Sequence, residues 1–114
     1  MDVRDAPCSV EEDAMLRRIV DTIAEALDPE QIILFGSRAR GDDTAHSDYD
    51  IFVVALSDQA YHDRNMQVRS LFSGRDFSMD AFVLTPKEYE AQRQVVNTLG
   101  FYVDRDGEVL YERS

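Results

Sequence analysis

Short apolar runs alternate with helical patterns along this chain, and the runs have the length of strands. The run I-I-L-F at residues 32–35 stops at Gly36 and is typical of a strand buried on both faces. A second run, at residues 49–56, is rich in branched side chains, which also favours a strand. Further strands are expected at residues 77–84 and 109–111. The chain should therefore build a sheet.

A helix is expected before the first strand. Ser9 followed by Glu12 has the spacing of a capping box, and apolar residues recur every four positions from Met15 to Leu27. Pro29 disfavours the helical conformation of the residue before it. The sequence thus predicts an amphipathic helix that ends just before this proline.

Two more helices are expected between and after the later strands. Residues 58–72 have only a loosely helical spacing of apolar side chains, and Gly74 should close a helix there. T-P-K-E predicts a helix over residues 86–93, because the missing N–H of Pro86 costs nothing in a first helical turn.

The C-terminal part has two readings. Residues 98–105 could form a helix that ends at Gly107, followed by one strand, or one arm of a hairpin that turns across Asp106 and Gly107. In either case strands alternate with helices, which indicates an α/β or α+β domain with helices packed on one sheet. At 114 residues, the chain has the length of a single domain, residues 1–114.

Charge and composition exclude several classes of function. The 12 basic and 23 acidic side chains give a net charge of −11, which repels nucleic acid and suits a basic partner protein or a metal ion. Cys8 is the single cysteine and cannot form an internal disulfide. The N-terminus lacks the pattern of a signal peptide, and no apolar run has the ~20 residues that a bilayer requires. We expect a cytoplasmic protein that spans no membrane.

An acidic pair marks the start of the second strand. Asp48 and Asp50 are two residues apart, so on a strand their carboxylates project from the same face. The two negative charges repel unless a cation lies between them, and hard oxygen ligands suit Mg²⁺. Two such ions can hold both the attacking and the leaving oxygen of a phosphoryl reaction.

A glycine and a serine at the end of the first strand offer a complementary site. Gly36 lets the backbone approach a ligand closely, and Ser37 begins a turn and short helix, expected at residues 37–41, whose N–H groups can bind a phosphate. Arg38 and Arg40 add positive charge. Each fragment alone is typical of an ordinary turn or a solvated strand end. Together, between two apolar strands, the fragments favour a nucleotide site.

Asp80 joins this set of acids because S-M-D-A-F-V-L places a lone carboxylate inside the third predicted strand. A buried charge without a partner is costly, so the residue requires a cation or another partner. Asp76 lies on the same face of that strand and is the alternative, although its position before the apolar run is typical of a solvated loop acid.

These motifs resemble the minimal nucleotidyltransferases of the DNA polymerase β superfamily. The resemblance rests on G-S-R-A-R-G, on Ser47-Asp48-x-Asp50, and on a third aspartate in a strand that leads into L-T-P. It implies a polymerase β-like fold, a single mixed sheet with helices on one side. It also implies that Gly36 and Ser37 bind nucleotide phosphate, and that the three acids, Asp48, Asp50 and Asp80, bind two Mg²⁺ ions. The third acid would also activate an acceptor hydroxyl.

Members of this size resemble antitoxins that pair with a helical RNase toxin of the HEPN type. The resemblance implies transfer of AMP from ATP to a tyrosine of that toxin, within a hetero-oligomer. Two alternatives stay open: a binding module that neutralises the toxin by contact alone, and nucleotidyl transfer to a small molecule. Three converging acids favour an enzyme over a binding module, and small-molecule enzymes generally resemble this domain with an additional helical one.

Overall fold

A four-stranded mixed sheet forms the centre of the protein, in the order β3-β2-β1-β4. The computed structural model describes residues 10–36, 49–72 and 79–113. Strand β1 is antiparallel to both of its neighbours, whereas β2 and β3 run parallel. The strands are β1 (Gln31–Phe35), β2 (Tyr49–Val54), β3 (Met79–Leu84) and β4 (Glu108–Glu112). The single mixed sheet with packed helices confirms the fold expected from the sequence.

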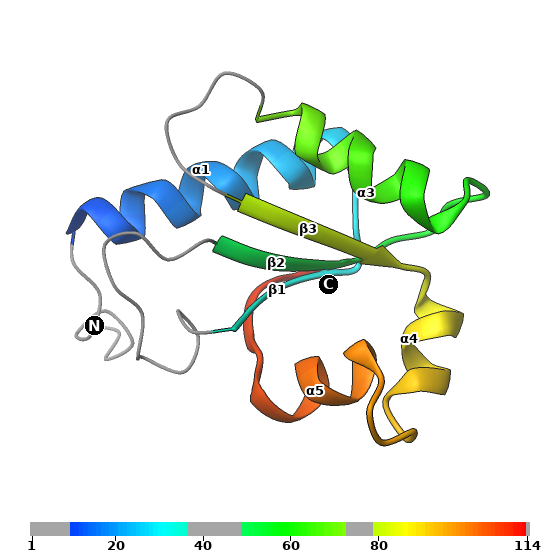
Figure 1. Ribbon diagram of the computed structural model, residues 1–114. Coiled ribbons are helices and arrows are strands. Elements are labelled where there is room, and N and C mark those ends of the chain that lie inside the picture. Colours follow the sequence, from blue (N-terminus) through cyan, green and yellow to red (C-terminus); the bar gives the residue numbers. More distant parts are fainter. Residues whose placement is uncertain (1–9, 37–48, 73–78, 114) are drawn as a thin grey trace.

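Helices cover both faces of this sheet (Figure 1). On one face lie α1 (Val10–Leu27) and α3 (Tyr61–Ser70), and on the other lie α4 (Pro86–Gln92) and α5 (Leu99–Asp106). The expectation of helices on one side is therefore wrong. The reason lies in the strands themselves, because consecutive apolar residues point to opposite faces and both faces must then be shielded from water.

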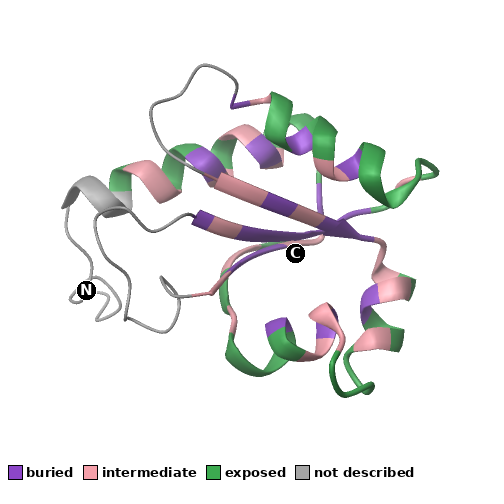
Figure 2. Cartoon of the chain, in the orientation of Figure 1, coloured by how far each residue is buried: buried purple, intermediate pink, exposed green. Residues whose placement is uncertain are grey.

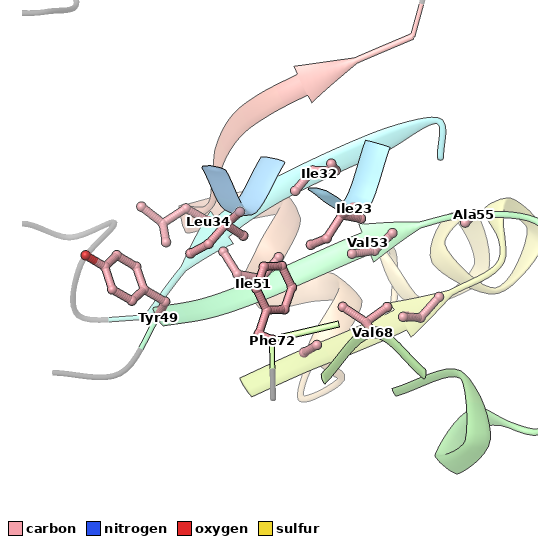
Figure 3. Close-up of a cluster of buried hydrophobic side chains, with 12 residues drawn as sticks. Ile23, Ile32, Leu34, Tyr49, Ile51, Val53, Ala55, Val68 and Phe72 are labelled. Carbon is pink, nitrogen blue, oxygen red and sulfur yellow. The ribbon is translucent and has the colours of Figure 1, made fainter. Parts of the chain in front are cut away.

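The larger core lies between the sheet and helices α1 and α3 (Figure 3). Ile19 and Ile23 of α1 are completely buried, and Val68 of α3 joins them. Alternate strand residues complete the cluster, among them Ile32, Leu34, Ile51, Val53, Ala81 and Val83. The apolar strand residues on this face of the sheet therefore pack against α1 and α3.

A smaller core lies on the opposite face, under α4 and α5. Phe52, Ile33 and Leu84 come from the strands, while Tyr89 of α4 and Val103 of α5 close over them. Burial follows the same pattern in Figure 2, where the inner strands are mostly buried and the outer helix faces are exposed. Because the C-terminal segment forms helix α5 followed by the single strand β4, the helix interpretation is correct and the hairpin interpretation is wrong.

The ends of the described elements agree with the sequence signals. Helix α1 ends at Leu27, just before Pro29. Thr85 caps α4, because its side chain accepts from the Glu88 N–H while the Glu88 carboxylate accepts from the Thr85 N–H. The serine expected to cap α1, the short helix expected at residues 37–41 and the glycine expected to close α3 all lie outside the described residues.

Helix α3 also protects the outer edge of β3. The N–H of Val83 donates to Oδ1 of Asn65 over 2.7 Å, and the carbonyl of Val83 accepts from Nη1 of Arg64 over 3.1 Å. Both backbone groups of this edge residue are therefore satisfied by neighbouring side chains of one helix. An unprotected edge would offer these groups to another chain.

Arg64 connects this edge to the second helical layer. Its guanidinium binds the Glu88 carboxylate through two bonds, of 2.7 and 3.1 Å, and its Nε donates to the carbonyl of Gln59. The Arg64 side chain is only 9% exposed, and its hydrogen bond lowers the pKa of Glu88. The pair fixes the start of α4 beside α3.

Within the part of the chain that the structure describes, no helix has the length and apolar character needed to cross a membrane.

The Arg64–Glu88 pair should make stability depend on pH. Because the pKa of Glu88 is lowered in the fold, its carboxylate stabilises the protein fully above the unfolded pKa of about 4.3. This contribution is lost as the pH falls through the folded value. Glu88→Gln keeps an acceptor for the Thr85 N–H and should cost about 0.5–1 kcal/mol at neutral pH. The difference from wild type in urea denaturation should shrink as the pH falls below the unfolded pKa of glutamate and close once the pH has passed the lowered folded pKa.

Glu90→Gln is the matched control, because Glu90 pairs with the half-exposed Arg93 at the surface of the same helix. Its cost should stay below about 0.5 kcal/mol. A Glu88→Gln effect that does not vary with pH would contradict a role for the charge.

Candidate active site

Gly36 follows the last residue of β1 in a backbone conformation that favours glycine. Its φ angle is +81°, in the left-handed region that residues with a side chain rarely adopt. A methyl group at this position would overlap Oδ2 of Asp50 and would lie 3.1 Å from its Cγ and 3.3 Å from its Cβ. The carboxyl group of Asp50 therefore lies directly against the backbone of Gly36.

Asp50 and Asp80 are neighbours on adjacent strands. Each is the second residue of its strand, and the parallel register of β2 and β3 pairs them directly. Neighbouring strands are about 4.8 Å apart, so both carboxylates leave the sheet side by side. Side chains alternate along a strand, which places the two acids on the α4 and α5 face, together with Phe52 and Phe82.

The end of β1 and the starts of β2 and β3 lie at one end of the sheet (Figure 1). Gly36, Asp50 and Asp80 thus come together although the first and the last are 44 positions apart in the sequence. Asp50 pairs with Phe35 in the antiparallel register of β1 and β2. At this end of the sheet the backbone of Gly36, which carries no side chain, lies near two adjacent carboxylates.

These donors fit a divalent cation. Two carboxylates held side by side repel each other, and a hard cation such as Mg²⁺ removes that repulsion and prefers oxygen ligands. Among the residues that the structure describes, no group of three or more histidine, cysteine or acidic side chains gathers in a metal-binding arrangement. Asp48, which the sequence motif pairs with Asp50, lies outside those residues.

The other predicted site residues are also outside the described part of the chain. They are Ser37, Arg38 and Arg40, together with Asp76, the alternative to Asp80. Their proposed roles stay predictions. The structure brings together the remaining three, Gly36, Asp50 and Asp80.

A group of aromatic rings, which was not among the predicted site residues, lies on the same face of the sheet as the acids. The ring centroids of Phe35 and Phe82 are 5.7 Å apart, and those of Phe35 and Phe52 are 6.5 Å apart in an edge-to-face arrangement. The signal was present in the sequence, because both strands repeat the pattern Asp-x-Phe, as Asp50-Ile-Phe52 and Asp80-Ala-Phe82. On a strand this spacing places each phenylalanine on the same face as its aspartate.

The aromatic group continues into α4. The ring centroid of Tyr89 lies 5.1 Å from that of Phe52, and the residue is 8% exposed. Burial raises the pKa of Tyr89, so its phenol is neutral across the physiological range. This tyrosine therefore has a packing role.

Comparison with known proteins identifies the family. The family described as "Polymerase beta, Nucleotidyltransferase" matches residues 17–114. No curated protein matches the chain. The fold resembles the crystal structure of a protein from Sulfolobus solfataricus that is assigned as a nucleotidyltransferase, with 27% identity and a TM-score of 0.63. That match covers 88% of this chain and 79% of the other.

Two toxin–antitoxin structures are also similar. One contains AMP-PNP and matches with 23% identity and a TM-score of 0.62, over 86% of this chain and 73% of the other, a level that shows the fold alone. The second is a mutant of the pair MntA-HpeT, with 25% identity, a TM-score of 0.60 and coverage of 87% and 73%.

The contact between Gly36 and Asp50 can be tested by a double-mutant cycle. Gly36→Ala should destabilise the fold by about 1–3 kcal/mol, because alanine at positive φ is strained and its methyl group overlaps the Asp50 carboxylate. In an Asp50→Ala background the overlap with Oδ2 and Cγ is gone. The cost of Gly36→Ala should then fall by about 0.5 kcal/mol or more in urea denaturation.

Gly107→Ala provides the control for this cycle. A methyl group there would meet Cγ2 of Ile33 at 2.5 Å and the carbonyl oxygen of Val103 at 2.6 Å, so it should also destabilise the fold. Its cost should be unchanged by Asp50→Ala. If Gly36→Ala and Asp50→Ala are simply additive, the carboxylate does not lie against Gly36.

Proposed function

The chain belongs to the polymerase β nucleotidyltransferase family, and on that premise we propose that it transfers AMP from ATP to a hydroxyl group of a partner protein. The observation that carries this proposal is the pairing of Asp50 with Asp80 in the parallel register of β2 and β3, beside the bare backbone of Gly36. Two adjacent carboxylates supply the hard oxygen ligands that a divalent cation prefers.

Residues at this end of the sheet would bind the nucleotide and its metal ions together. Asp48, Asp50 and Asp80 would hold Mg²⁺, as the family motif implies. When bound, Mg²⁺ supplies positive charge that offsets the charge on the triphosphate. Gly36 and Ser37 would bind phosphate oxygens, and Arg38 and Arg40 would add positive charge.

The proposed reaction replaces a phosphoanhydride bond of ATP with a phosphate ester bond to the acceptor. The acceptor hydroxyl oxygen forms a bond with the α-phosphorus of ATP, and the bond from that phosphorus to the bridging oxygen of pyrophosphate breaks. Asp80 takes the proton of the acceptor hydroxyl as general base. The products are AMP esterified to the acceptor and free pyrophosphate.

The proposed partner is a toxin of the HEPN type, and a tyrosine is the proposed acceptor. Support comes from the family resemblance and from the two toxin–antitoxin structures that share the fold. The net charge of −11 also favours association with a basic protein. This protein would then act as the antitoxin by modifying its partner.

Labelled ATP tests this function directly. The protein is incubated with Mg²⁺, a candidate HEPN partner and ATP labelled either on the α-phosphate or on the γ-phosphate. Label from the α-phosphate should become covalently attached to the partner, and label from the γ-phosphate should appear in pyrophosphate. Neutralisation of the toxin without any attached label would contradict the enzymatic proposal and support binding alone.

The two described acids should differ in their effects on catalysis. Asp80→Asn should lower transfer by about 10²-fold or more, as expected for a lost general base, and leave ATP binding largely intact. Asp50→Asn should instead weaken Mg²⁺-dependent ATP binding in calorimetry. The control is Asp76→Asn, which should change neither quantity. A loss of transfer in the control, with normal transfer in Asp80→Asn, would assign the base to Asp76.

A further inference from the structure

Two partly exposed phenyl rings stand between the carboxylates and the smaller core. Phe35 and Phe82 are half-buried, whereas Phe52 behind them is completely buried. Phe35 belongs to β1 and Phe82 to β3, so the two rings approach each other across the intervening β2. They form the border between the apolar interior and the acidic end of the sheet.

The register places each of these rings next to one of the acids. Phe35 is the direct partner of Asp50 on the antiparallel strand pair, a position in which Cβ atoms are about 4.5–5.5 Å apart. Phe82 follows Asp80 by two residues on the same face of β3. Each of the two acids therefore has one of the two rings as a near neighbour on the same face of the sheet.

We propose that Phe35 and Phe82 are positioning residues that hold the Asp50 and Asp80 carboxylates in place for the metal ion. An aspartate side chain has three staggered χ1 positions. The rings are 5.7 Å apart and pack against the smaller core, while the carboxyl group of Asp50 lies against Gly36. This inference rests on the proposed function, because it presumes that the acids bind a divalent cation.

The aromatic pair also lowers the dielectric around the acids. Rings on the core side keep water away from one side of each carboxylate, which strengthens the attraction of both groups for a cation. Leucine at either position would keep an apolar side chain but would leave space into which a carboxylate could turn. Loss of a group that orients metal ligands typically costs about 10–100-fold in metal affinity.

The test measures Mn²⁺ binding, without nucleotide, by electron paramagnetic resonance for wild type, Phe35→Leu and Phe82→Leu. Phe82→Met is a further variant, because methionine keeps the apolar volume while losing the rigid ring. Each variant should bind Mn²⁺ about tenfold or more weakly than wild type. Cooperative thermal unfolding confirms that each variant is folded.

Phe101→Leu is the matched control. Phe101 is also half-buried, but it packs on α5 against Tyr102 and beneath the guanidinium of Arg105, outside the aromatic group of Phe35, Phe52 and Phe82. Its Mn²⁺ affinity should equal that of wild type.

The possible failures are distinguishable. If wild type binds no Mn²⁺ even with a non-hydrolysable ATP analogue present, the proposed function is overturned. If wild type and the folded ring variants bind Mn²⁺ equally, the positioning role alone is overturned. The same holds if the ring variants keep their Mn²⁺ affinity and lose only affinity for the ATP analogue, a result that would instead make the rings part of the nucleotide-binding surface.

Discussion

The parallel pairing of β2 with β3 is the constraint on which the site depends. It sets the register that places Asp80 beside Asp50, and a parallel pair requires a crossover connection, which includes α3. Helix α3 is fixed to β3 by Asn65 and Arg64, which bind both backbone groups of Val83. The packing that protects the sheet edge therefore also holds the two acids in register.

The acidic end of the sheet is a local conflict within an otherwise consistent fold. Five apolar strand residues of the larger core are almost completely buried along β1 and β2, yet adjacent carboxylates stand where β2 and β3 begin. Departures of this kind from good packing are expected at functional sites. A divalent cation bound by both acids, as proposed above, would offset their mutual repulsion.

Much of the fold could be predicted from the sequence because its signals are local. Strand β1 is a continuous apolar run, and α4 carries a complete capping box with Pro86 in its first turn. The second helical layer was missed because the apolar character of both strand faces was not followed to its consequence. The Arg64–Glu88 pair joins residues 24 positions apart and has no local signal. The repeated Asp-x-Phe pattern is visible in the sequence, but only the register of β2 and β3 shows that the two aspartates, and likewise the two phenylalanines, are direct neighbours.

The central claim is that Asp50 and Asp80 together bind one metal ion at the end of the sheet where β2 and β3 begin. Anomalous scattering from crystals grown with Mn²⁺ and a non-hydrolysable ATP analogue tests this claim most directly. The account predicts an anomalous peak within ligand distance of carboxylate oxygens from both residues, on the face that carries Phe35 and Phe82. A nucleotide bound with its Mn²⁺ away from either carboxylate would contradict it.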